Sequence, residues 1–399
     1  MTFFPFVRFD NYNLTNDPLD RVKPGVYFTS SDYLNRYSIF GAFSINKRME
    51  RDVYASLEYR NKIPLLYSLG IKPTLLLELF SVSRVANNNI FFGVDSTNLP
   101  PTYDFIIPIN VTYNLFEFDV ALKHKMFADG NDIELRFIYS DYTTRLSSFS
   151  LPNAKGLYPA TKDVYFIGRS FQFTYWHKML MPYIDSDINP VGREITFQFN
   201  YDLDKFNSDG NYIANESGVI VPQYNNYTFF KTEFDWQEHI SLNKYHHTIN
   251  GRIKAGSIIG PELPSFFNYY VGGLVGMKGY PFYSIEGNKS YWMHLEYRLP
   301  IFKNIDNRFG PWYLDKIFMS VYADVGNAWS GKFVGMDKTK KAAGAEIRIK
   351  MNSFYLFPTA IFVNVAYGFD KFSTVVREKD ITYGKEFLFY AGVLFDFSL

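Results

Sequence analysis

Alternation of apolar and polar residues, repeated along the chain, is the feature that most constrains the fold. From Ile195 to Leu203 every odd-numbered residue is apolar or aromatic, whereas the residues between them are Thr, Gln, Asn and Asp. The same pattern recurs at 132–139, 291–299 and 387–397. Successive side chains of a β-strand point to opposite faces, so each segment has one apolar face and one polar face. The sequence therefore predicts an all-β chain.

The alternating segments predict sixteen strands, many of them long. Their ranges are 3–10, 24–30, 36–47, 51–60, 71–83, 113–126, 132–146, 164–177, 193–203, 228–242, 247–259, 291–300, 317–329, 341–351, 359–370 and 386–398. Strands of soluble proteins usually have about 5–6 residues, whereas a tilted membrane strand needs about 9–11. An even number of antiparallel strands can close without leaving a free edge. We therefore expect a single closed 16-stranded antiparallel transmembrane β-barrel.

The connections between the predicted strands differ in length in a regular way. Those at 31–35, 61–70, 127–131, 243–246 and 352–358 are short, and those at 84–112, 147–163, 204–227, 260–290 and 371–385 are long. Outer-membrane barrels have short periplasmic turns and longer outer loops. With the first strand starting in the periplasm, we expect the long loops outside and both termini in the periplasm.

Composition agrees with this fold and argues against some partners. The chain has 41 Phe and 32 Tyr, which suits lipid-facing Phe and interfacial Tyr, although a large soluble core would also use them. Its net charge of +1 argues against a nucleic-acid partner, because nucleic-acid binding depends on excess Lys and Arg. No secretory signal opens the sequence, so we expect residues 1–399 to be the barrel domain of a longer protein whose upstream periplasmic region is absent.

No arrangement of residues indicates an enzyme. The chain has no Cys, which removes thiolate chemistry and disulfides. Adjacent His246 and His247 would point apart on a strand, so they make a poor metal pair. No motif identifies a Ser as a nucleophile with a His and an acid to activate it. We therefore expect neither catalysis nor a metal or other cofactor.

The connection at 260–290, between predicted strands eleven and twelve, is the most distinctive stretch. It contains five glycines in the seventeen residues from Gly272 to Asn288. Glycine lets the backbone bend where a Cβ atom would clash. Such a loop could fold inward and pack in the barrel lumen, and the alternative is an ordinary mobile outer loop.

Several motifs in this region together resemble a known family. The segment Gly276-Met277-Lys278-Gly279-Tyr280-Pro281, followed by Gly287-Asn288 and by residues 295–300, is similar to the inward-folded loop and next strand of the BamA-type outer-membrane assembly-factor superfamily, also called the bacterial surface antigen family. Residues 322–329 and 344–350 resemble the two strands that follow. The resemblance is firm from about 270 to 399 and weaker upstream.

The resemblance implies that residue 278 reaches from the loop tip to an acid on the barrel wall. The family usually has Arg there, whereas this chain has Lys278, which cannot make the planar two-pronged contact of Arg. The candidate lumen partners, all on predicted inward faces, are Glu296, Arg298, Asp324 and Glu346. The alternative is a hydrated ladder of lumen charges without a dedicated partner.

The end of the chain carries a second resemblance. Tyr390, Gly392, Phe395 and Phe397 are similar to the C-terminal β-signal read by the outer-membrane assembly machinery. Physically, an exposed strand with alternating aromatic residues suits pairing with a partner sheet. The alternative is that these residues form an ordinary closing strand of a barrel and carry no recognition signal. Near the other end, Pro5 lacks a backbone donor and is tolerated mainly in edge strands, which hints at a weak seam between the first and last strands.

By resemblance, the expected function is insertion or translocation of client or secreted polypeptides at the bacterial outer membrane. The expected partners are those polypeptides, outer-membrane lipid and the assembly machinery, with no nucleic acid. Three other functions stay open. A passive pore or uptake channel would share the strands and lumen charges, a soluble β-sandwich module would need no detergent, and an anchor would only carry an upstream domain or surface antigen.

Overall fold

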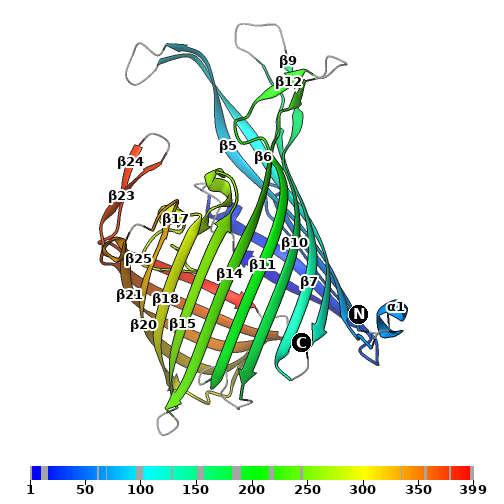
Figure 1. The fold of residues 1–399 in the computed structure, drawn as a ribbon, viewed down its shortest axis with the longest axis vertical. Helices are drawn as coiled ribbons and strands as arrows, with labels where there is room; N and C mark the ends of the chain where they lie inside the picture. Colours follow the sequence, from blue (N-terminus) through cyan, green and yellow to red (C-terminus); the bar gives the residue numbers. More distant parts are fainter. Residues whose placement is uncertain are drawn as a thin grey trace. The chain divides into compact units, whose positions relative to one another are not determined.

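The computed structural model describes most of the chain. The described residues are 2–9, 17–60, 63–68, 70–95, 102–126, 129–150, 157–181, 190–214, 220–242, 246–333, 335–354, 357–376 and 379–395. Figure 1 shows that strands dominate them. The helical segments are short: α1 (Pro64–Ser68), η1 (Pro18–Arg21), η2 (Ser265–Phe267), η3 (Phe282–Ser284) and η4 (Met336–Lys338). In the described part of the chain, no helix has the length and apolar character needed to cross a membrane.

Each of the sixteen predicted ranges overlaps one strand of the structure. These strands are β1 (Thr2–Phe9), β2 (Val22–Ser31), β3 (Tyr37–Ile45), β4 (Arg51–Tyr59), β5 (Thr74–Asp95), β6 (Thr102–Lys125), β7 (Asn131–Leu146), β10 (Thr161–Leu180), β11 (Gly192–Phe206), β14 (Asn225–Leu242), β15 (His247–Ile259), β18 (Lys289–Phe302), β20 (Trp312–Trp329), β21 (Lys340–Ser353), β22 (Phe357–Gly368) and β25 (Phe387–Phe395). With the short β19 (Asn307–Phe309), the described residues contribute seventeen strands to one sheet. The all-β prediction is confirmed.

The chain divides into two compact units. Unit 1 comprises Met1–Lys125, Ile133–Phe173 and Asn200–Phe229, and unit 2 comprises Met126–Asp132, Thr174–Phe199 and Phe230–Leu399. Within unit 1, β1 to β6 pair antiparallel in chain order. Within unit 2, the antiparallel order is β14, β15, β18, β20, β21, β22 and β25. Unit 2 carries all residues of the predicted loop motif.

The prediction of a long loop at 84–112 is wrong. β5 and β6 stay paired from Thr74 and Lys123 as far as Asp95 and Thr102, whereas β4 pairs with β5 only up to Val82. Figure 1 shows the two strands continuing side by side as an antiparallel pair. The ladder joins backbone groups, so it continues through residues 87–89, three asparagines with low strand propensity and no alternation.

Other predicted loops also contain short hairpins. β8 (Phe149–Ser150) pairs with β9 (Leu157–Tyr158), β12 (Tyr212–Ala214) with β13 (Ile220–Pro222), and β23 (Phe372–Val376) with β24 (Lys379–Tyr383). Each lies between two long strands of the large sheet. The predicted loop ranges therefore mark real connections, but the connections are partly β-structure.

Burial along the strands of unit 2 is the reverse of that in a soluble sheet. On β18, Leu295 is 59% exposed, whereas its neighbour Glu296 is 9% exposed. On β22 Val363 is 56% exposed and Asn364 is fully buried. Exposing apolar surface to water costs about 25 cal/mol per Å². This pattern is typical of a sheet whose apolar face contacts hydrocarbon.

Candidate functional site

The connection between β15 and β18 has a defined structure of its own. At its base, β16 (Tyr269–Tyr270) pairs with β17 (Glu286–Gly287). Within it, the Gly273 N–H donates to the Tyr280 carbonyl over 2.8 Å, and the Met277 N–H donates to the Val271 carbonyl over 2.7 Å. We call residues 271–288 the motif loop. Its internal hydrogen bonds give it a fixed shape, which an ordinary mobile loop lacks.

An apolar cluster attaches the motif loop to the sheet of unit 2. Met277 and Tyr280 are fully buried. They form a cluster with Val271 and Ile285 of the loop, Trp292 of β18 and Ala342 of β21. Burying side chains of this size contributes roughly 1.5–3 kcal/mol each. The loop is therefore part of the folded core of unit 2.

Gly279 lets the loop backbone touch the sheet. A Cβ atom at 279 would lie 2.6 Å from the Ala342 Cβ and 2.9 Å from the Gly368 backbone nitrogen. Real Cβ atoms do not approach backbone atoms so closely, so any other residue would push the loop away. The glycine in the predicted motif thus has a steric reason.

The hydroxyl of Tyr280 joins the loop to β21 and to the segment that follows β22. It donates to the Lys341 carbonyl over 2.8 Å and accepts from the Asp370 N–H over 3.0 Å. Burial raises the pKa of Tyr280 to about 12, so the hydroxyl keeps its proton at neutral pH. Both of its hydrogen bonds are therefore present over the physiological range.

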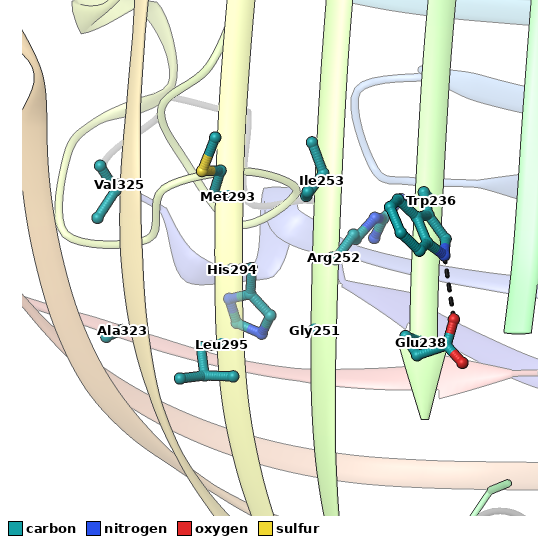
Figure 2. A pocket seen from close by; sticks show the side chains of 10 residues that line it. All are labelled: Trp236, Glu238, Gly251, Arg252, Ile253, Met293, His294, Leu295, Ala323 and Val325. Carbon is teal, nitrogen blue, oxygen red and sulfur yellow. Dashed lines mark hydrogen bonds between the residues drawn. The ribbon is translucent and has the colours of Figure 1, made fainter. Parts of the chain in front are cut away.

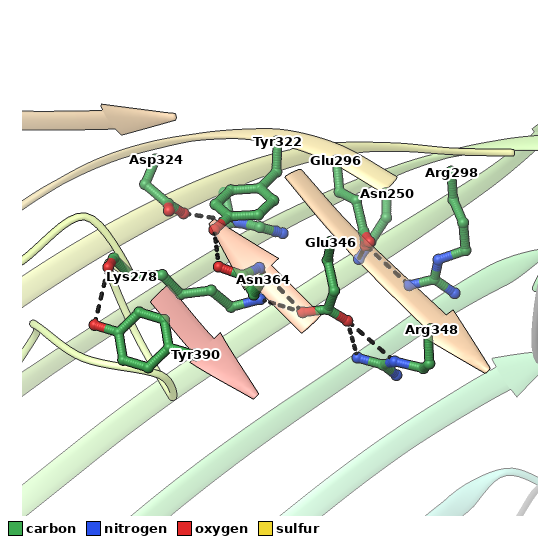
Figure 3. A network of polar contacts seen from close by, with 11 residues as sticks. Asn250, Lys278, Glu296, Arg298, Tyr322, Asp324, Glu346, Arg348, Asn364 and Tyr390 are labelled. Carbon is green, nitrogen blue, oxygen red and sulfur yellow. Dashed lines mark hydrogen bonds and ion pairs between the residues drawn. The ribbon is translucent and has the colours of Figure 1, made fainter. Parts of the chain in front are cut away.

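Lys278 contacts one of the candidate acids. Its Nζ lies 2.9 Å from Glu346 Oε2 and 4.7 Å from the ring centroid of Tyr322 (Figure 3). The Glu346 side chain is 6% exposed and that of Lys278 is 18% exposed. A buried charge needs a partner, and each of these two charges supplies one for the other.

Glu346 has further donors around it. Arg348 donates to Oε1 from Nε over 3.0 Å and from Nη2 over 2.5 Å. The Asn364 amide donates to Oε2 over 3.2 Å, and its own oxygen accepts from the Tyr322 hydroxyl over 2.8 Å. Sequence reasoning missed Arg348, Asn364 and Tyr322. Their positions on the polar face could have been found from strand alternation, but their contact with Lys278 and Glu346 could not.

The other predicted lumen residues pair elsewhere. Asp324 accepts from the Trp292 indole over 2.9 Å and lies 2.7 Å from His294 Nδ1. Glu296 accepts from Arg298 over 2.9 Å, and the Asn250 amide lies 3.3 Å away. Within the described ranges, no group of three or more His, Cys, Asp or Glu could hold a metal ion. The site therefore offers ion pairs and hydrogen bonds that hold a loop on a sheet.

The predicted C-terminal signal lies partly at this site. The Tyr390 hydroxyl of β25 donates to the Lys278 carbonyl over 3.0 Å. Gly392 lies under the ring of Phe362, where a Cβ would come within 2.9 Å of a ring carbon. Phe395 pairs through its backbone with Thr359, and Phe397 lies outside the described residues. Only Tyr390 of the four touches the motif loop in the described structure.

Replacing Tyr390 by Phe tests this contact. The variant loses one hydrogen bond to the Lys278 carbonyl, so we expect the free energy of unfolding to fall by about 1 kcal/mol. Urea unfolding in lipid vesicles, followed by Trp fluorescence, measures it. Tyr367→Phe is the matched control, because Tyr367 packs against Phe387 and Phe369 at the other face of the sheet. Equal losses in both variants would contradict a specific role for the Tyr390 hydroxyl.

Comparison with known proteins gives structural but not sequence matches. No protein-family model fits the sequence, and no curated protein matches it. BamA from Haemophilus ducreyi, lacking POTRA domains 1–3, matches 98% of this chain with 69% of its own, at a TM-score of 0.53 and 12% identity. CdiB from Escherichia coli matches 99% with 68% of its own, at 0.53 and 10%. CdiB from Acinetobacter baumannii matches 94% with 57% of its own, at 0.51 and 9%.

These matches extend over almost the whole chain, beyond the region that carries the motifs. At such low identity they concern the fold alone. The predicted resemblance to the BamA-type superfamily is confirmed at that level. The chain has the fold of these BamA and CdiB structures.

Proposed function

We propose that this chain is a bacterial outer-membrane barrel that inserts or translocates client polypeptides. In this proposal residues 1–399 form one barrel domain and the motif loop lies in the lumen. Both termini are periplasmic. The predicted closed sheet is not found in the described residues, where β1 pairs with β2 and β25 with β22 but β1 and β25 do not pair with each other. The likeness to BamA and CdiB supports the general kind of function.

The attachment of the motif loop to β25 carries the proposal. The loop tip bonds to β21 through Lys278 and Glu346 and to β25 through Tyr390. β25 is the last strand of the described chain, and a terminal strand is where a client strand could add by β-augmentation. A loop bonded to that strand links the position of the loop to the pairing of the strand. A passive pore has no use for such a link.

The work of this function needs no nucleotide or metal. A client strand gains backbone hydrogen bonds when it pairs with an exposed strand edge. A barrel wall that is short on one side thins the nearby lipid and so reduces the barrier to insertion. The interaction partners are then the client chain, outer-membrane lipid and the machinery that delivers the client, and we propose no catalytic step.

Client assembly by the reconstituted chain tests the function. The chain is placed in lipid vesicles, a small urea-denatured outer-membrane barrel is added, and its folding is followed by its shift in gel mobility. We expect folding several-fold faster than in vesicles that hold a porin of similar size. Deleting 272–288 should abolish the gain. Equal folding rates in both vesicles, or full ion conductance with no effect of the deletion on folding, would instead favour the passive pore.

Single engineered cysteines on β11 test which face meets lipid. The chain has no Cys of its own, so each substitution gives one labelling site. With a water-soluble maleimide on vesicles, we expect Gln198→Cys to react at least tenfold faster than Phe197→Cys, because hydrocarbon excludes the reagent. Both variants should react equally in urea, which is the control. Faster labelling at 197 would invert the faces and remove the basis for a membrane barrel.

A further inference from the structure

A shallow groove crosses the apolar face of unit 2, over β14, β15, β18 and β20 (Figure 2). Its volume is about 380 Å³, within the roughly 300–1,000 Å³ usual for small-molecule sites. Its apolar walls come from the exposed side chains of Trp236, Ile253, Met293 and Leu295 and from the half-buried Val325. The groove lies on the face opposite to the charged network around Lys278, because Leu295 and Glu296 are consecutive residues of β18.

Two small residues, Gly251 and Ala323, lie on either side of Leu295 in one row of the groove lining. Cross-strand pairing aligns Glu238 with Gly251, Gly251 with Leu295, and Leu295 with Ala323. Directly opposite residues share a face of the sheet. A Cβ at 251 would meet no heavy atom within 4 Å. The open space at Gly251 therefore comes from its missing side chain, and a larger residue at 251 would fill this part of the groove without moving the backbone.

One end of the groove is polar. Glu238 accepts from the Trp236 indole over 3.2 Å and from Arg193 Nε over 3.1 Å, and its other oxygen accepts from Arg193 Nη2 over 3.3 Å. The Arg193 side chain is 48% exposed and that of Glu238 is 34% exposed. A guanidinium has five N–H donors and a carboxylate has about four acceptor positions, so both retain capacity for a ligand.

This polar end and the apolar walls belong at different depths of a bilayer. A charged pair facing hydrocarbon is costly, whereas Trp, Arg and Glu are well placed at the headgroup level. The Arg193–Glu238 end therefore lies at the headgroups, and the strip from Ile253 to Val325 lies against acyl chains. The groove joins the two levels.

We propose that this groove binds one phospholipid with an ethanolamine headgroup. One acyl chain lies over Gly251 and along Ile253 and Met293, the phosphate accepts hydrogen bonds from Arg193, and the ammonium donates to Glu238. A choline headgroup has no N–H to donate, and an anionic glycerol headgroup brings no cation for the carboxylate. Charge complementarity thus selects this occupant over those two. The proposal rests on the membrane location given under the proposed function.

Native mass spectrometry of the full chain in detergent micelles tests the proposal. Phosphatidylethanolamine, phosphatidylcholine and phosphatidylglycerol with identical acyl chains are titrated in turn. We expect one bound phosphatidylethanolamine at about tenfold higher affinity than either other lipid, as loss of one charge-assisted hydrogen bond would give. Gly251→Leu and Arg193→Gln should each reduce that affinity about tenfold.

Ala345→Leu is the matched control. Ala345 pairs with Val321 on the same apolar face but does not line the groove, so it should leave lipid affinity unchanged. Equal affinity for the three lipids, or an equal loss in Ala345→Leu, would overturn the proposal. Arg193→Gln changes an exposed side chain, so it stays informative even if Gly251→Leu fails to fold. If the three lipids bind equally while position 198 still labels faster than 197, the lipid site alone is wrong. If position 197 labels faster than 198, the membrane location is wrong.

Discussion

Replacing Glu346 by Ala is expected to free the motif loop and to lower the free energy of unfolding by about 3 kcal/mol. Removing one partner of a buried ion pair costs about 3–5 kcal/mol, because the remaining charge is left without compensation. Lys278 would lose its only ion-pair contact in the described structure, whereas Arg348 is 31% exposed and can reach water. This places the effect near the lower end. Urea unfolding in vesicles measures the loss, and trypsin cleavage after Lys278 should become much faster.

Glu262→Ala is the control for the loss of a carboxylate. Glu262 is exposed in the same connection between β15 and β18, and exposed substitutions usually change stability by less than about 0.5 kcal/mol. Lys278→Met should cost less than Glu346→Ala, since Glu346 would keep Arg348 and Asn364 as donors. If Glu346→Ala and Glu262→Ala have equal effects on stability and cleavage, the ion pair does not hold the loop.

Replacing Gly279 by Val is expected to displace the motif loop without removing any charge. A Cβ at 279 would clash with Ala342 and with the backbone at 367 and 368, so the loop must shift away from β21 and β22. Overpacking of this kind typically costs about 1–3 kcal/mol, and the backbone contact places this variant at the upper end. We also expect client assembly to fall to the level of the loop deletion.

The matched control for that substitution is Gly251→Ala. It adds a Cβ to a strand glycine of the same unit where no heavy atom lies within 4 Å. We expect it to leave trypsin cleavage in the motif loop unchanged. Normal stability and normal assembly in Gly279→Val would show that the loop does not need to lie against the sheet.

The positions of the strands follow from the sequence because alternation is a local signal. Each predicted range depends only on which residues of one segment are apolar, so no knowledge of neighbouring strands is needed. The pairing of β5 with β6 as far as Asp95 and Thr102 was missed for the same reason. Residues 87–89 do not alternate, and β5 and β6 continue past them because their backbones pair with each other.

The motif loop was found from glycine spacing and its resemblance to a family, but its contacts were not. From the sequence alone, Glu296, Asp324 and Glu346 are equally good candidate partners of Lys278, since each lies on the polar face of its own strand. In the structure Lys278 pairs with Glu346. Glu296 pairs with Arg298, and Asp324 contacts His294 and Trp292.

What the sequence by itself determined is the class of fold, the number and position of the long strands, and the segment that carries the loop. What only the tertiary structure decided is which side chains meet. The stagger between β18, β20, β21 and β22 sets the height of each polar side chain, and the close approach at Gly279 sets where the loop tip lies. Both are relations between segments far apart in the chain, and side-chain periodicity within one segment contains no information about them.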